Sequence, residues 1–315
     1  MRFFTHIFII LILGITTQCF AAETIDQSLP ASDVSSVNIE NLRGLVTVIG
    51  WDKQQIQVQG ELDEQAEKFI FEQQGAQVNI KVVMPHQSRG HWQGDGSELT
   101  INMPTSVRMT FSGVSSDVVL QNLAQGVEAK TVSGNIKASA LSRHIELGTV
   151  SGDIKANDMS GKIQMGTVSG DIEDTGSEGR LQLQAVSGNV ESDSSAKEVV
   201  VNTVSGNIDL NLHLVDELEI SSVSGNSQAQ MQLNDNGTVK LSSVSGDLRV
   251  QFQQQIQANF RLTANAGGEL INKLTSDKAK HAKYGPGSKL NFSTGNGNSS
   301  VRASTVSGNI RVSSK

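Results

Sequence analysis

The sequence predicts an all-β protein, a β-solenoid (parallel β-helix-like) with coils of about 18–22 residues and a less regular N-terminal β cap. Two observations carry this prediction. The tetrapeptide Val-Ser-Gly-Asn/Asp occurs eight times, and its first five copies are each 18 residues apart. Between the copies, apolar and polar residues alternate with a period of two, which is typical of half-buried strands and argues against a helical repeat.

Each coil is predicted to hold two short strands joined by a sharp corner. In the coil 144–161, Ile145 and Leu147 belong to the first strand and Ile154 to the second, with Ser-Gly-Asp between them. Glycine accepts a positive φ without steric cost, and Asn or Asp can bond its own backbone in such a turn. We therefore expect structural turns at Gly134, Gly152, Gly170, Gly188, Gly206, Gly225, Gly246 and Gly308.

The direction of the repeated valine is the main ambiguity within a coil. Leu147 and Val150 are three residues apart, so a straight strand cannot point both of them inward. A bulge at Gly148 would return Val150 to the interior, and this is the interpretation that we favour. In the alternative, the strand stays straight and the valines form an exposed apolar stripe, which would be a binding surface.

The first third of the chain lacks the strict period. Strand patterns are predicted near 37–39, 45–49, 56–58, 78–82 and 99–103. Residues 63–74 suit one short helix with Asp63 as its N-cap, although Phe69-Ile70-Phe71 also suits a strand. We expect 23–106 to be a strand-rich cap and 107–315 to hold the solenoid repeats.

Composition indicates an exported protein without disulfides. Residues 1–22 are typical of a signal peptide, with Arg2 before a short apolar run and small residues at the expected cleavage site; a retained anchor is the alternative. The single cysteine, Cys19, falls inside this segment. A formal net charge of −7 argues against nucleic acid as a partner, and we expect no membrane span once the signal is removed. The expected location is the periplasm, the cell surface or the medium.

Two irregular segments are candidate contacts for a partner. The polar loop 85–97 contains Arg89 and Trp92, and an exposed tryptophan beside an arginine could contact a sugar or a protein. A Lys-rich insertion at 273–289 interrupts the repeats, and its Lys278, Lys280 and Lys283 could meet an anionic partner. Packing of Trp92 onto the cap is the alternative for the first segment, and a solvated surface loop is the alternative for the second.

The sequence offers no catalytic, cofactor-binding or metal-binding motif. Asp153 and Asp171 occupy equivalent turn positions and could bring two carboxylates together, but the same column continues with asparagines, as a hydrogen-bonded turn ladder requires. His86, His91 and Asp95 match no defined metal spacing. We therefore predict no catalytic residues, no cofactor and no metal.

The repeated Thr-Val-Ser-Gly-Asn/Asp-Ile follows a segment that contains the run 45–52, Leu-Val-Thr-Val-Ile-Gly-Trp-Asp. In these features the chain resembles the bacterial "putative adhesin" β-strand-repeat family, a domain family of unknown function. The resemblance extends from about residue 35 onward and implies an exported, solenoid-like β fold.

These observations favour a non-enzymatic adhesin-like protein or envelope scaffold that binds an unknown protein or glycan of the cell envelope. Two alternatives stay open. Parallel β-helices often carry polysaccharide-active enzymes, which would need acidic or basic side chains converging on one lateral groove. A periplasmic partner in envelope-stress signalling is the third possibility.

Overall fold

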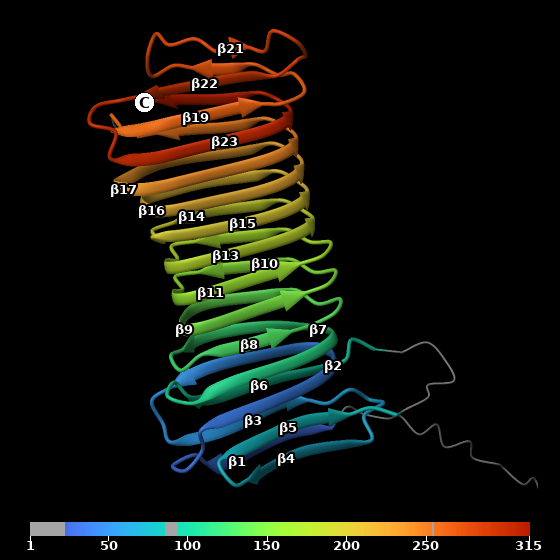
Figure 1. The fold of residues 1–315 in the computed structure, drawn as a ribbon. Helices are drawn as coiled ribbons and strands as arrows, with labels where there is room; N and C mark the ends of the chain where they lie inside the picture. Colours follow the sequence, from blue (N-terminus) through green and yellow to red (C-terminus); the bar gives the residue numbers. More distant parts are fainter. Residues whose placement is uncertain (1–22, 86–93, 254) are drawn as a thin grey trace, which may run out of the picture.

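The computed structural model describes residues 23–85, 94–253 and 255–315, and within them all regular structure is β. The strands join into a single 24-stranded sheet that winds into an elongated stack of coils (Figure 1). The predicted β-solenoid is thus confirmed. The predicted signal peptide lies outside the described residues, and the domain boundaries stay a prediction.

The middle of the stack has the geometry that the repeat predicts. β11 (Ser160–Thr167) pairs in parallel with β9 (Ile136–Thr149) and β13 (Glu178–Ser187), and each residue faces its equivalent one repeat away, as Ile163 faces Ile145 and Leu181. The strands of this part are β7 (Arg108–Leu123), β8 (Val127–Lys130), β9 (Ile136–Thr149), β10 (Ile154–Asn157), β11 (Ser160–Thr167), β12 (Ile172–Thr175), β13 (Glu178–Ser187), β14 (Val190–Ser194), β15 (Glu198–Ser205) and β16 (Ile208–Ser224).

The core runs through the inside of the coils as stacked columns of apolar side chains. Ile145, Leu147 and Ile154 are each at most 1% exposed. A single coil of this size could not bury enough apolar surface to fold alone, so each coil depends on its neighbours above and below.

One coil near the N-terminal side is inserted between segments that follow it in the chain. β2 (Ser36–Trp51) pairs in parallel with β5 (Gln77–Val83) and β6 (Ser97–Pro104) on one side and with β7 on the other. β3 (Gln55–Glu61) lies antiparallel to β6 and to β1 (Thr24–Pro30), and β4 (Lys68–Gln74) lies antiparallel to β5. The solenoid therefore extends into the region expected to be only a cap.

The opposite end repeats this arrangement. β23 (Ser299–Ser307) lies between β17 (Ser227–Ser245) and β19 (Ala258–Ala264), as Figure 1 shows. Likewise β24 (Ile310–Ser314) lies between β18 (Leu248–Phe252) and β20 (Leu270–Asn272). β22 (Ser288–Ser293) and the short β21 (Lys280–His281) cover this end.

The helix considered for 63–74 is wrong, because this stretch ends in strand β4. Phe69 and Phe71 are partly buried against the core, and an antiparallel partner satisfies the backbone of the strand. Asp63 does not cap a helix but forms an ion pair with Arg43. Among the described residues, no helix is long and apolar enough to cross a membrane.

Candidate functional site

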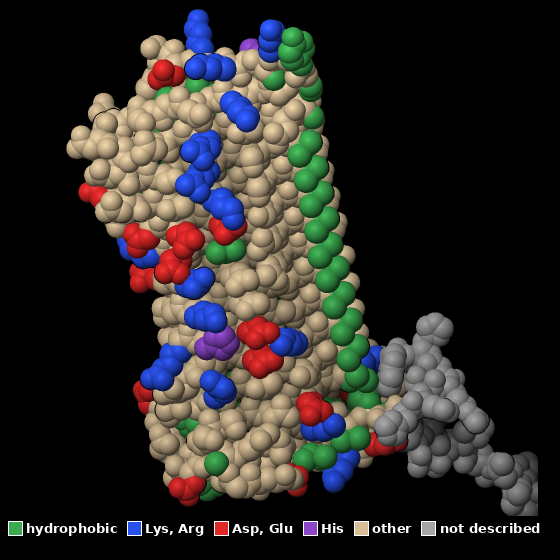
Figure 2. All heavy atoms as spheres, in the orientation of Figure 1, with side chains coloured by type: hydrophobic (Ala, Val, Ile, Leu, Met, Phe, Trp, Pro, Cys, Tyr) green, Lys and Arg blue, Asp and Glu red, His purple; other side chains and the backbone are tan. Residues whose placement is uncertain are grey.

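The repeated valines point outward and form one continuous row, the valine stripe. They are 42–48% exposed, whereas the residue before each of them from Val132 onward is buried. Figure 2 shows the row as an apolar line along one edge of the stack. Its members are Val114, Val132, Val150, Val168, Val186, Val204, Val223, Val244 and Val306.

The favoured interpretation, a bulge that buries the valine, is therefore wrong. The strand stays straight through Leu147 and Thr149, and the threonine is the inward residue, only 6% exposed. Burial of its hydroxyl is tolerated because the hydroxyl donates a hydrogen bond to the backbone carbonyl of Gly134 in the preceding coil, at 3.0 Å. Thr131 and Thr167 make the equivalent bond one coil away on either side. The next residue, Val150, must then face solvent.

A shallow groove of about 550 Å³ runs beside the stripe across its central coils. One wall is formed by Val168, Val186, Val204 and Val223. The buried threonine column lies along the groove, and the far side has small or polar side chains: Gly166, Gln184, Asn202 and Ser221. The stripe and the groove together form an apolar surface that follows the solenoid axis.

The corner glycines are required mainly by close stacking. A Cβ on Gly152 would lie 1.9 Å from the carbonyl oxygen of Gly134, a distance that no side chain tolerates. The expectation that each glycine needs a positive φ is right for Gly206, Gly225, Gly246 and Gly308. It is wrong for the other four, whose φ lies outside the left-handed region: Gly134, Gly152, Gly170 and Gly188.

The Asn/Asp residues of the corners tie one coil to the next. The side-chain oxygen of Asn189 accepts the backbone N–H of Asn207 at 3.1 Å, and that of Asn207 accepts the N–H of Asn226 at 3.1 Å. We expected each side chain to bond its own backbone, and this detail is wrong because the stacked corner places a nearer donor in the next coil. The ladder runs from Asp117 to Asn309 and Glu269.

Asp153 and Asp171 are members of this ladder, and each uses Oδ1 to accept a backbone N–H of the following coil. They line a small hollow of about 230 Å³ with Lys155, Glu173 and Glu191. Lys155 forms an ion pair with Glu173 at 2.6 Å, which is the main cause of its raised pKa. The two aspartates are therefore occupied by hydrogen bonds between coils, and a lysine offsets part of the local negative charge. Both features argue against a role of these carboxylates in acid/base catalysis.

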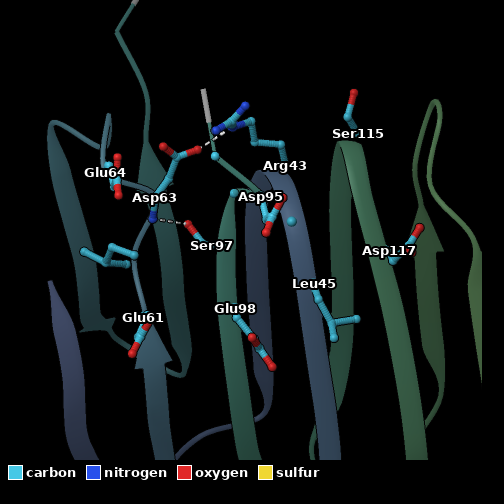
Figure 3. Close-up of a pocket in the computed structure, with 14 residues that line it drawn as sticks. Arg43, Leu45, Glu61, Asp63, Glu64, Asp95, Ser97, Glu98, Ser115 and Asp117 are labelled. Carbon is cyan, nitrogen blue, oxygen red and sulfur yellow. Dashed lines mark hydrogen bonds and ion pairs between the residues drawn. The ribbon is translucent and has the colours of Figure 1, made fainter. Parts of the chain in front are cut away.

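A larger pocket of about 570 Å³ lies near the N-terminal side and has a strongly acidic lining (Figure 3). The buried carboxylate of Asp63 forms an ion pair there with the partly buried Arg43, and the backbone N–H of Asp63 donates to Ser97 Oγ at 3.0 Å. Further carboxylates come from Glu61, Glu64, Asp95, Glu98 and Asp117. No group of acidic, His or Cys side chains that could hold a metal occurs in the part of the chain that the structure describes.

None of the predicted partner contacts that the structure describes lines the groove beside the valine stripe. Arg89 and Trp92 lie outside the described residues, as do His86 and His91. Lys278, Lys280 and Lys283 are exposed at the C-terminal end of the stack, where Lys283 lies over the Tyr284 ring. The stripe is the alternative that the sequence left open. The signal that decides for it is the residue before each valine, a buried threonine in five of the coils, which sequence reasoning did not place inside.

A family model described as Toastrack DUF4097 matches residues 34–313. Among solved structures, a "putative" adhesin from Bacteroides fragilis is 13% identical, with 93% of this chain and 97% of that chain covered and a TM-score of 0.39. A "putative" adhesin from Parabacteroides distasonis gives the same four values. A "putative" cell adhesion protein from Clostridium sporogenes is 10% identical over 93% of this chain and 100% of that chain, with a TM-score of 0.24. No curated protein matches the sequence.

Proposed function

The chain belongs to the Toastrack DUF4097 family, and we propose that it is an exported, non-enzymatic, adhesin-like or scaffolding protein of the cell envelope. Its partner in this proposal is another protein, which lays an apolar face along the valine stripe. The signal-peptide pattern of residues 1–22 supports export.

The observation that carries this proposal is the concentration of exposed apolar side chains in one row. Of the large hydrophobic side chains that are exposed in the described residues, all except Tyr284 belong to the valine stripe. With about 4.8 Å between coils, the row extends for roughly 40 Å. Contiguous exposed apolar surface of this kind marks interaction sites in soluble proteins.

The chemistry beside the stripe fits a protein partner better than a bare sugar. The groove is lined by valine and by small side chains such as Gly166 and Ala185, so it excludes water from an apolar face pressed against it. Sugars are held largely by aromatic faces and polar groups, and the described part of this surface has no aromatic lining.

Site-specific photo-cross-linking in intact cells tests the proposal. A photoreactive phenylalanine analogue at Val168, Val186 or Val204 is expected to give one discrete protein adduct that mass spectrometry identifies. Matched controls at Lys162 and Glu173, which are exposed on the same coil as Val168 but away from the stripe, are expected to give none.

Equal labelling at stripe and control positions would contradict the proposal. An adduct with a single regulatory protein of the envelope would favour the signalling alternative over adhesion. Cleavage of a polysaccharide by the purified chain, lost in an Asp153→Asn, Asp171→Asn double variant, would establish the enzyme alternative instead.

A further inference from the structure

Three basic side chains line up on neighbouring strands near the C-terminal end. Arg261 on β19 faces Arg302 on β23, and Arg302 faces Lys240 on β17. All three are exposed. Figure 2 shows basic side chains gathered in a column over these strands, on the same view as the valine stripe. Like charges directly opposite each other on adjacent strands are destabilising, so their alignment needs a reason.

The two arginines have no acidic partner among the described residues. Lys240 is neutralised by an ion pair with Glu219 in the preceding coil. Ion pairs between neighbouring coils also engage Lys155 and Arg180. None of the ion pairs between described residues includes Arg261 or Arg302, whose paired strands lie about 4.8 Å apart. A bound anion would offset the repulsion between them.

These guanidinium groups belong to a groove of about 560 Å³ that contains no acidic side chain. Its other polar lining consists of amides and hydroxyls, from Asn259, Asn291, Asn298, Ser293, Ser299 and Ser300. Beneath the strands, the buried rings of Phe260 and Phe292 stack with their centroids 4.4 Å apart and fix the backbone of the groove.

We propose that this groove binds a carboxylated saccharide. Arginine presents a planar fork that matches a carboxylate, and two forks one strand apart can share one carboxylate or hold two successive ones. The surrounding amides and hydroxyls supply donors and acceptors for sugar hydroxyls. With a net charge of −7, the chain as a whole does not attract polyanions, so recognition would be local to the two arginines. This inference is independent of the function proposed for the valine stripe.

Titration calorimetry on the purified chain tests it, with trigalacturonic acid as the acidic probe and maltotriose as the neutral one. We expect binding of the acidic trisaccharide only, weakened by added salt. Arg302→Gln and Arg261→Gln should each lower the affinity roughly tenfold or more, because each removes a charge-assisted hydrogen-bonding group. Arg302→Lys should lose affinity as well, since it keeps the charge but not the fork.

Arg311→Gln is the matched control, because it removes the same charge from the second strand of the same coil, outside the groove. Thermal unfolding of each variant checks that it remains folded. No preference for the acidic over the neutral trisaccharide would overturn the proposal, as would equal affinities in the groove and control variants. Inorganic phosphate binding as tightly as trigalacturonic acid would show a simple anion site and would overturn it too.

Discussion

At the scale of single residues, the buried carboxyl of Asp174 is the least expected feature of the core. It is 2% exposed and occupies the column of Ala156 and Ser192. Burial raises its pKa above the ordinary value of 3.8, against hydrogen bonds from the hydroxyls of Ser177 and Ser192, and the charge of Asp193 raises it further. The folded state therefore holds this proton more tightly than the unfolded state does.

The stability that this proton contributes is complete below the unfolded pKa and is lost as pH rises through the raised folded pKa. We therefore expect Asp174→Asn to raise the free energy of unfolding at pH 7, by about 1.4 kcal/mol for each unit of the pKa shift. Urea unfolding between pH 5 and 8 measures the effect, and the advantage of the variant should shrink as pH falls. Asp209→Asn, at an exposed site, is the control. An advantage that grows toward low pH would refute the assignment.

At the scale of the element, the corner sets how closely coils can approach. Gly188→Ala places a Cβ where the carbonyl oxygen of Gly170 would be 1.9 Å away, so the backbone of two coils must shift. We expect a loss of about 1–3 kcal/mol in the free energy of unfolding, as for overpacking elsewhere. Ser187→Ala, the exposed neighbouring position, should change it by less than about 0.5 kcal/mol. Similar losses in both variants would mean that the glycine column is not a packing requirement.

The corner also shows how far the sequence determines the structure. The period located the eight Val-Ser-Gly corners, and the alternation of Ile145, Leu147 and Ile154 identified the core. This pattern did not determine the direction of Val150. Thr149 is polar, so the pattern predicts that its side chain faces solvent and that the side chain of Val150 faces the core. The burial of Thr149 depends on a carbonyl of the preceding coil, which is a contact between repeats and has no signal within one repeat. The Arg261 and Arg302 pair was missed for the same reason, since the two residues are distant in sequence and adjacent only through the inserted coil.

At the scale of the whole molecule, destabilising one coil should affect the coils that lie next to it in the stack. Nearness along the chain should matter less. Val301 is fully buried on β23, between β17 and β19. Val301→Asp places a charge in this coil, and we expect backbone amides of β19 and β22 to lose hydrogen-exchange protection by an order of magnitude or more. The central strands β9 to β13 should keep theirs, because contacts in a solenoid reach only to neighbouring coils.

Arg302→Gln, at the exposed position next to it, should leave the exchange pattern unchanged. A uniform loss of protection along the described chain would show instead that the stack unfolds as one unit. Loss confined to β23 itself would show that the strands above it pair without its support.

The inserted coil also has a kinetic consequence. Residues 258–293 leave the ribosome before residues 299–314, yet the later segment lies beneath the earlier one in the stack. Strand β19 therefore cannot pair with its parallel neighbour, β23, until β23 has been synthesised and has inserted between β17 and β19. Such long-range pairing is slow, because distant segments must meet before any contact stabilises them. We infer that the C-terminal end closes last, and that until then β17 presents an unpaired strand edge on which quality-control factors or other chains can act.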